Sequence, residues 1–381
     1  MSDFEGFHDP ARHLAGRRLP SPDKTVYGCR VDTHRGSVKS VRSLTDDTYE
    51  LVVECGADAQ AALNAKAGQY AALKVAGLDK PRSYSFARAP ECEAAGQSTF
   101  FIRLVPNGKF SGWLFEKDRT GEEIVLSGPL GAFGLDPSSD RMLCVAGGSG
   151  MSAIFSILEH ACNKQVARDA LFFYGARTHK DLYCLDELAE IGKRWHSGHS
   201  FEFIPVLSEE PEDSGWDGAR GFVTDYMKKT CLDNGRIDLA QCKAYFCGPP
   251  PMIDSGIKVL MDAGMPGSGI FYDKFEDAAS PAPVIDNTKC VLCDECLLVK
   301  PTDNCIIEVS KLIRNSGPGS DRYEVVNPSE TSGLYYNTLY IDEEKCIRCY
   351  ACVDACPANA ISPDYDKTPK TLRGVAARGI T

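Results

Sequence analysis

The chain has 381 residues and a net charge of -11, with 43% hydrophobic and 25% charged residues. This length predicts two or three domains, and the composition is that of a soluble globular protein. The acidic balance argues against nucleic acid or an anionic membrane surface as a partner, and favours a basic patch on a partner protein.

The sequence shows no sign of export or membrane insertion. Residues 1–5 offer neither the basic start nor the apolar core of a signal peptide, and no stretch reaches the roughly 18 apolar residues of a membrane span. Of 17 cysteines, eight lie in two runs near the C-terminus, and the scattered remainder indicates reduced thiols. We therefore expect a cytoplasmic protein.

Residues 1–34 are polar and without a clear period, so they are expected to form an N-terminal extension. Alternating apolar and polar residues then predict six short strands, separated by turn-forming glycine, proline and aspartate. The predicted strands are 37–41, 49–53, 70–75, 82–87, 100–105 and 123–126. Six such strands predict a small antiparallel β-barrel over residues 35–134.

Three motifs lie in this predicted barrel: Arg82-Ser83-Tyr84-Ser85, Gly108-Lys109-Phe110-Ser111 and the glycine-rich segment 128–133. A guanidinium fork suits pyrophosphate, and glycine N–H groups and a hydroxyl suit phosphate oxygens. Each motif alone is weak evidence, because an arginine in a strand is more often an ordinary surface residue. Their order and spacing together favour a flavin site.

From about residue 135, strands alternate with helices. An apolar strand at 142–146 leads through Gly147-Gly148-Ser149-Gly150 into a helix at 151–162, and further strands are predicted at 170–174, 201–206 and around 245. This pattern predicts an α/β domain with a parallel sheet over residues 135–276. The glycine turn is not G-x-G-x-x-G, but glycine N–H groups at a helix N-terminus suit phosphate, which makes Gly148, Ser149 and Gly150 candidate cofactor contacts.

With the run Y-G-A-R at 174–177 and C-G-P-P-P-M at 247–252, residues 35–276 resemble the ferredoxin-NADP reductase superfamily, most closely the reductase components of bacterial oxygenases. The resemblance implies FAD, with Arg82 on its pyrophosphate, Tyr84 on the isoalloxazine and Ser85 near N5. It also implies an NAD(P)H site. The cofactor contacts that it implies or allows are Ser83, Gly108, Lys109, Ser111, Gly148, Ser149, Gly150, Gly175, Arg177, Cys247, Gly248 and Pro249.

The resemblance places Cys247 where nicotinamide meets flavin and Phe275 near the flavin face, so Ser85, Cys247 and Phe275 are the catalytic candidates. A buried, unreactive thiol is the alternative for Cys247. For Asp273, a proton-handling role and a solvated surface position remain open. Four carboxylates in the segment Ser208 to Asp213 should repel the 2′-phosphate of NADPH, which predicts NADH as the electron donor.

A proline-containing linker at 277–286 leads to a predicted ferredoxin domain at 287–362, followed by a polar tail at 363–381. Two cysteine runs define this domain: Cys290, Cys293, Cys296 and Cys305, then Cys346, Cys349, Cys352 and Cys356. The second run, C-x2-C-x2-C-x3-C-P, has iron–sulfur spacing, whereas the first has eight residues before its last cysteine. Paired zinc sites are the alternative.

The two runs resemble a bacterial two-cluster ferredoxin, a small α+β fold. That resemblance implies one [4Fe-4S] cluster on Cys290, Cys293, Cys296 and Cys356, and a second on Cys346, Cys349, Cys352 and Cys305.

Nicotinamide gives up a hydride, which carries two electrons, whereas each iron–sulfur cluster accepts one electron, and of the three groups only flavin does both. The chain is therefore expected to convert two-electron transfer into one-electron transfer. We expect an iron–sulfur flavoprotein reductase that passes electrons from NADH through FAD and the clusters to a separate acceptor protein, with an oxygenase component as the expected acceptor. A diaphorase-type subunit of a larger redox complex, a ferredoxin:NAD+ reductase and a redox sensor are the alternatives.

Overall fold

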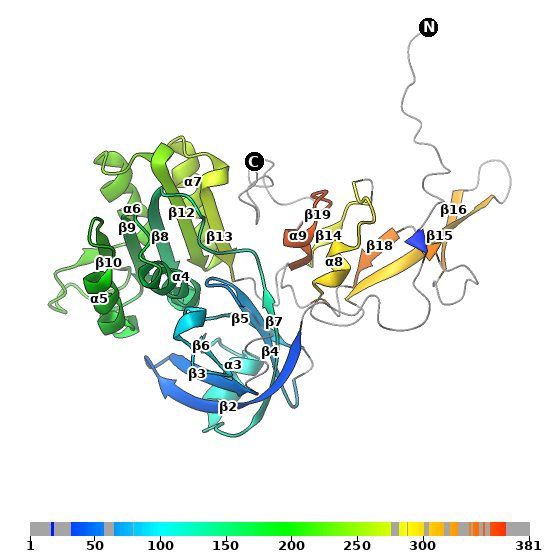
Figure 1. Ribbon diagram of the computed structural model, residues 1–381, viewed down its shortest axis with the longest axis horizontal. Coiled ribbons are helices and arrows are strands. Elements are labelled where there is room, and N and C mark those ends of the chain that lie inside the picture. Colours follow the sequence, from blue (N-terminus) through cyan, green and yellow to red (C-terminus); the bar gives the residue numbers. More distant parts are fainter. Residues whose placement is uncertain are drawn as a thin grey trace, which may run out of the picture. The chain divides into compact units, whose positions relative to one another are not determined.

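The structure is a computed structural model, and it describes residues 17–18, 32–56, 65–78, 80–275, 282–287, 289–300, 305–315, 321–326, 335–336, 338–342, 346 and 351–362. The chain forms two compact units, one built on residues 32–279 and one on residues 280–368 (Figure 1). No helix in the described ranges is both long enough and apolar enough to cross a membrane.

The larger unit begins with a six-stranded antiparallel sheet. Its strands are β2 (Thr33–Ser43), β3 (Thr48–Cys55), β4 (Tyr70–Val75), β5 (Arg82–Ser85), β6 (Gln97–Arg103) and β7 (Glu123–Leu130), and their order is β5-β4-β7-β2-β3-β6. A bridge between Phe86 and Phe100 links the two edges, so the sheet nearly closes. Helix α3 (Lys109–Glu116) packs Phe110 and Leu114 into its core. The predicted barrel is confirmed.

Strand β6 ends at Arg103, two residues before the predicted end, because the backbone of the next residue forms a hydrogen bond outside the strand pairing. The backbone N–H of Leu104 donates to the carbonyl of Asp47, 2.8 Å away, in the turn between β2 and β3. The chain then leaves the sheet and enters the turn before α3.

The second half of the larger unit is a six-stranded parallel sheet. Its strands are β8 (Arg141–Gly147), β9 (Ala170–Ala176), β10 (Phe201–Leu207), β11 (Ala219–Arg220), β12 (Cys242–Gly248) and β13 (Ile270–Lys274), in the order β11-β10-β9-β8-β12-β13. The chain leaves β8 on one side toward β9 and returns on the other side at β12. In such sheets ligands bind at the carboxyl ends of the strands, where this order reverses.

Helices cover both faces of the parallel sheet, which explains the continuous apolar runs in its strands (Figure 1). Alternate residues of β8 face opposite sides: Met142 and Cys144 pack with α4 (Met151–Asn163) and α5 (Leu185–Arg194). Leu143 and Val145 pack with α6 (Val223–Met227) and α7 (Pro250–Asp262). The predicted α/β domain is confirmed.

In its described residues the smaller unit has several strands and two short helices, α8 (Glu295–Leu298) and α9 (Ala351–Ala355). Its strands are β14 (Val284–Ile285), β15 (Ile306–Asn315), β16 (Asp321–Val326), β17 (Tyr335–Tyr336), β18 (Thr338–Ile341) and β19 (Ile361–Ser362). Strand β14 pairs with β19, β15 lies between β16 and β18, and β1 (Arg17–Arg18) pairs with β17. The predicted small α+β fold is confirmed.

A buried ion pair joins the antiparallel sheet to α4. Arg88 follows β5, and its guanidinium donates to both carboxylate oxygens of Glu159 at 2.5 to 3.1 Å. The backbone N–H of Ala89 donates to the same carboxylate at 2.8 Å, and the hydroxyl of Ser156 donates to the carbonyl of Arg88. Only 9% of the Glu159 side chain is exposed, so this carboxylate depends on its partners.

We therefore expect Arg88→Ala to destabilise the larger unit, because it leaves Glu159 buried with one backbone donor. The loss should be about 2–4 kcal/mol, and the thermal midpoint should fall by roughly 5–10 °C. Arg35→Ala is the matched control, because its partner Glu123 and Arg35 itself are 62% and 80% exposed. That pair should contribute at most about 1 kcal/mol. Equal falls in both variants would contradict the role assigned to Arg88.

Candidate functional site

The strand β5 carries the Arg-Ser-Tyr-Ser motif along one edge of the antiparallel sheet. Arg82 donates to the carbonyls of Lys80 and Pro81, 3.0 Å away in each case. Ser83 is exposed, whereas Ser85 is buried. The ring of Tyr84 lies 5.0 Å from that of Phe110, so the motif meets the segment that begins α3.

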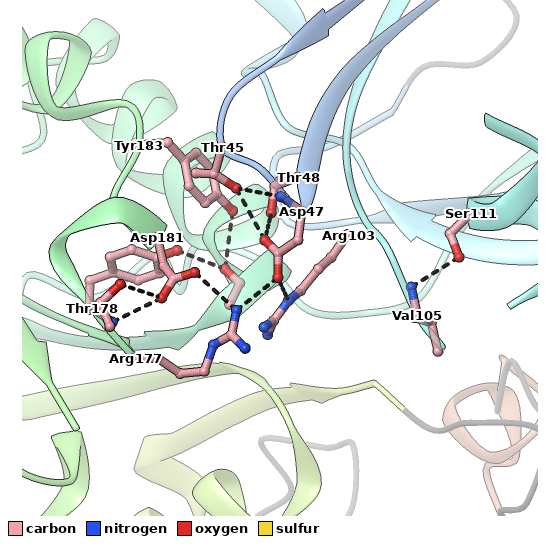
Figure 2. A network of polar contacts seen from close by, with 12 residues as sticks. Thr45, Asp47, Thr48, Arg103, Val105, Ser111, Arg177, Thr178, Asp181 and Tyr183 are labelled. Carbon is pink, nitrogen blue, oxygen red and sulfur yellow. Dashed lines mark hydrogen bonds and ion pairs between the residues drawn. The ribbon is translucent and has the colours of Figure 1, made fainter. Parts of the chain in front are cut away.

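The second predicted phosphate segment forms the start of α3. Gly108 precedes the helix, Lys109 is its first residue, and the hydroxyl of Ser111 accepts the Val105 N–H at 3.1 Å (Figure 2). A Cβ on Gly108 would lie 2.5 Å from that hydroxyl oxygen, so glycine is required for this turn. The Ser111 hydroxyl keeps its own proton for donation to an anion at the helix N-terminus.

Three side chains meet where the two sheets face each other. The hydroxyl of Ser85 donates to the Oδ2 of Asp273 at 3.3 Å, and the Sγ of Cys247 lies 4.0 Å from the same oxygen. Residues 247 and 273 are partners in the parallel pairing of β12 with β13. Burial raises the pKa of Asp273 to about 7 and raises the pKa of Cys247 above its usual range. Asp273 is therefore not a solvated surface aspartate.

Glycines bring the carboxyl ends of β8 and β12 together beside this group. A Cβ on Gly150 would lie 2.1 Å from the carbonyl oxygen of Cys247. Gly248 has φ of +140°, and its carbonyl accepts the N–H of Phe275 at 3.1 Å. The structure thus brings Cys247, Gly248 and Phe275 together, with Ser149 in the adjacent turn.

A cavity of about 190 Å³ lies at the carboxyl ends of β8, β9 and β10. Four residues predicted from the sequence line it: Gly148, Gly175, Arg177 and Pro249. Cys247, Gly248, Ser149 and Gly150 lie beside it rather than in its wall. Sequence reasoning missed lining residues from separate parts of the chain, namely Asp47, Arg103, Tyr183 and Phe222, whereas Tyr174, Ser208 and Met252 lie in segments that it had singled out.

Two tyrosines in the cavity wall fix the glycine turn. The hydroxyls of Tyr174 and Tyr183 both donate to the carbonyl of Gly148, each at 3.1 Å. Gly148 has φ of +55°, a conformation that suits glycine. Arg103 reaches this turn from β6, and its guanidinium would lie 3.1 Å from a Cβ on Gly148. A cation and a glycine turn therefore lie side by side in the cavity wall, which suits a phosphate group.

One of the four carboxylates in the acidic segment after β10 is engaged by a neighbouring side chain. Glu210 is buried, and it accepts both the backbone N–H and the ring nitrogen of His179 at 2.7 Å. Burial opposes its ionisation, but hydrogen bonds from Ser214 and His179 outweigh burial and lower the pKa of Glu210 to about 2. Its charge is thus committed to His179 and does not face an incoming nucleotide as a free carboxylate.

Seven of the eight cysteines in the two runs are described, and Cys349 lies outside the described residues. Burial raises the pKa of the Cys296 thiol to about 12, and the nearby thiols of Cys290, Cys356 and Cys293 add to the rise. These are the four residues that the ferredoxin resemblance assigns to one cluster. Among the described residues, no three His, Cys, Asp or Glu side chains converge on a single metal ion. A cluster instead takes its thiolates at separate iron atoms.

The backbone around these thiols suits a negatively charged iron–sulfur cluster. Leu292 and Asp294 have φ of +52° and +66°, conformations that few non-glycine residues adopt. A hydrogen bond from the Leu292 N–H to Cys290 partly offsets the effect of burial on the pKa of that thiol. The Ala360 N–H donates to the Sγ of Cys356 at 3.2 Å. Such N–H donors are among the features that set cluster potentials.

Three family descriptions match the chain in this order. Residues 35–134 match the oxidoreductase FAD-binding domain, residues 144–256 the oxidoreductase NAD-binding domain, and residues 339–362 the 4Fe-4S binding domain. The first match covers the antiparallel sheet apart from the start of β2, the second covers the parallel sheet from within β8 to β12, and the third includes the second cysteine run. The chain therefore has FAD-binding and NAD-binding domains and a 4Fe-4S binding motif.

Relatives among characterised proteins are reductases of oxygenase systems. The chain is 44% identical over 208 residues to the xylene/toluene monooxygenase electron transfer component XylA of Pseudomonas putida, covering 55% of this chain and 57% of that protein. It is 36% identical over 261 residues to the propane 2-monooxygenase reductase component of Mycolicibacterium goodii, covering 66% of this chain and 70% of that protein.

Among solved structures, the ferredoxin reductase in carbazole 1,9a-dioxygenase is similar with a TM-score of 0.55 and 28% identity, over 65% of this chain and 70% of that one. Its match, like those of the other relatives, covers only part of each protein. The chain therefore belongs to the family of oxygenase reductase components, whose FAD-binding and NAD-binding domains are joined in this chain to a 4Fe-4S binding domain.

Proposed function

We propose that this chain is the NADH-dependent reductase component of an oxygenase system, and that it passes electrons through bound FAD and two [4Fe-4S] clusters to a separate oxygenase component. One observation carries the proposal: Ser85 of the FAD-binding domain and Cys247 of the NAD-binding domain meet at the Asp273 carboxyl, beside the nucleotide cavity. Bound FAD would supply the exchange of a two-electron hydride for the single electrons that iron–sulfur clusters carry.

The FAD-binding domain would hold the cofactor along β5 and α3. Tyr84 offers an aromatic face to the isoalloxazine, Arg82 offers its guanidinium to the pyrophosphate, and the start of α3 at Gly108 to Ser111 offers N–H and hydroxyl donors to phosphate. Ser85 would lie near N5. Because Ser85 also contacts Asp273, the same side chain links the flavin position to the NAD-binding domain.

The nucleotide would lie along the cavity at the carboxyl ends of the parallel strands. Its phosphates suit the Gly148 turn, with Arg103 beside it, and its adenosine suits the side near Ser208 and Phe222. The nicotinamide would then reach Cys247 at the end of β12. Strand β12 flanks β8 on the side opposite to β9 and β10. In this position Cys247 and Phe275 would orient the ring and exclude water, and Cys247 would form no covalent bond.

The cysteine runs support two cluster sites. Cys290, Cys293, Cys296 and Cys356 would hold the first, and Cys305, Cys346, Cys349 and Cys352 the second. Cys305 shares a hydrophobic core with Cys346 and Cys352. Backbone hydrogen bonds also connect it to that run, because the Asp342 N–H donates to the Cys305 carbonyl at 3.0 Å and the Cys346 N–H donates to the Asp342 carbonyl at 2.8 Å.

Replacement of Cys247 by alanine should slow reduction of bound flavin by NADH while FAD stays bound. The nicotinamide would lose a side chain that orients it, and a displacement of about 1 Å can reduce a rate on the order of a hundredfold. Stopped-flow bleaching of the flavin measures this rate. Cys144→Ala is the matched control, because Cys144 is equally buried in the same sheet on β8. Equal rates in all three proteins would show that Cys247 only fills space.

The raised pKa of Asp273 predicts a pH-dependent stability. Its folded-state pKa of about 7 exceeds the unfolded value of 3.8, so the folded protein binds the proton more tightly and loses stability as the pH rises between these values. Asp273→Asn should remove this loss. At pH 8 the variant should be more stable by roughly 2–4 kcal/mol, and near pH 4 the difference should vanish.

Thermal midpoints of the FAD-loaded protein between pH 4 and pH 8 measure this difference. Asp262→Asn is the control, since Asp262 is an exposed partner of Lys258 on α7. A constant difference in thermal midpoint between wild type and Asp273→Asn at every pH would refute the assignment of a half-buried carboxyl with a raised pKa.

Anaerobically purified protein should contain about eight irons and eight acid-labile sulfides per chain. Cys305→Ser should lower both to about four, whereas Cys92→Ser, which removes an exposed thiol outside the runs, should leave both unchanged. The Cys305→Ser protein should still reduce ferricyanide with NADH, since flavin can supply that acceptor directly. Electron delivery to a protein acceptor should collapse. Full delivery with one site empty would mean that the second cluster is not on the route.

A further inference from the structure

Asp47 occupies the turn between β2 and β3 and is held there on all sides (Figure 2). Its Oδ1 accepts the hydroxyls of Thr45 and Thr48 at 3.1 and 3.0 Å. Its Oδ2 accepts the Nε of Arg103 and a terminal nitrogen of Arg177, both at 3.0 Å. Burial opposes its ionisation, but Arg103 and these hydrogen bonds hold the pKa of Asp47 below its usual range. The carboxylate is therefore a fixed negative charge in the cavity wall.

The contact between Asp47 and Arg177 crosses from the FAD-binding to the NAD-binding domain. Arg177 follows β9, and its carbonyl accepts the N–H of Glu209 at 2.8 Å. Arg177 therefore lies beside the segment that begins with Ser208 after β10. In the order β10-β9-β8-β12, this segment follows the strand that is farthest from β12. If nicotinamide reaches Cys247, this is the side where the adenosine ribose lies.

Arg177 has a second acidic partner. The same terminal nitrogen donates to the Oδ1 of Asp181 at 3.0 Å. Among the described residues that line the cavity, the charged ones are Asp47, Asp181, Arg103 and Arg177. The two positive charges are thus balanced by two negative charges. The neighbouring His179 is paired with the buried Glu210. A 2′-phosphate, which would add about −1.5 to −2 charges, finds no net positive charge here.

We propose that Asp47 is a specificity-determining residue for the nicotinamide nucleotide: together with Asp181 it binds one terminal nitrogen of Arg177 and neutralises the charge of that guanidinium, which weakens its attraction for the 2′-phosphate of NADPH. The FAD-binding domain thereby contributes to selection of NADH. This inference rests on the proposed function, in which the cavity binds NAD(P)H. In this inference Asp47, rather than the buried Glu210, is an acidic residue that disfavours binding of the 2′-phosphate.

Asp47→Asn is a direct test, because asparagine keeps the Oδ1 acceptor for Thr45 and Thr48 but removes the charge. Asp181 is a poorer choice, since its Oδ2 also accepts the N–H and hydroxyl of Thr178. The matched control is Asp46→Asn, which removes the same charge from an exposed neighbour. Calorimetry on the FAD-loaded full chain measures the dissociation constants of NAD+ and NADP+, and steady-state assays measure kcat/KM for NADH and NADPH.

In Asp47→Asn, NADP+ should bind about fivefold more tightly, with a matching rise in kcat/KM for NADPH, because Arg177 becomes available to the phosphate. Binding of NAD+ should change by less than about twofold, and Asp46→Asn should change neither nucleotide by more than that. In an Arg177→Ala background the Asp47 substitution should no longer alter the preference, since the coupled partner is gone.

An equal change for both nucleotides would overturn the proposal, because Asp47 would then only hold the shape of the cavity. An unchanged preference in Asp47→Asn, or the same gain in the Arg177→Ala background, would also overturn it. If neither nucleotide binds to the wild-type protein, the proposed function itself fails, and this result is distinct from normal NADH binding with an unchanged preference.

Discussion

The carboxyl ends of β8 and β12 meet at a backbone contact that only glycine permits, and the site depends on that contact. A Cβ at Gly150 would lie 2.1 Å from the Cys247 carbonyl, and one at Gly248 would lie 2.7 Å from the Gly147 carbonyl. These distances are shorter than any stable contact between such atoms, so a side chain at either position would separate the strands. The contact places Cys247 beside the glycine turn and, through the pairing of β12 with β13, beside Asp273.

A second constraint aligns the two sheets of the larger unit. The Arg88–Glu159 pair ties the segment after β5 to α4, the helix that begins at the glycine turn. Ser85, three residues before Arg88, is thereby held close to Asp273. The flavin side and the nucleotide side of the site are thus positioned by one partly buried ion pair and one glycine contact.

The sequence predicted the elements with a clear period and missed the contacts between distant segments. The six antiparallel strands and the strands of the parallel sheet follow from alternating or continuous apolar residues, which are local patterns. Asp47, Arg103 and Tyr183 carry no local signal for a nucleotide site, because they reach the cavity from separate elements. For Glu210 the sequence predicted a carboxylate that repels the 2′-phosphate, but in the structure this carboxylate is buried against His179. The sequence gives no sign of that contact.

The hydrophobic core of the smaller unit is rich in cysteine. Its buried core contains Cys296, Cys305, Cys346, Cys352 and Cys356, together with a few aliphatic side chains such as Leu297 and Ile306. Small domains have modest hydrophobic cores, and metal centres are one common source of additional stability. Because Cys356 lies near the thiols of the first run, a cluster at that site would connect the beginning and the end of the unit. The same thiols would then serve electron transfer and folding, so the first run tolerates unusual backbone conformations at Leu292 and Asp294 that a purely apolar core would not require.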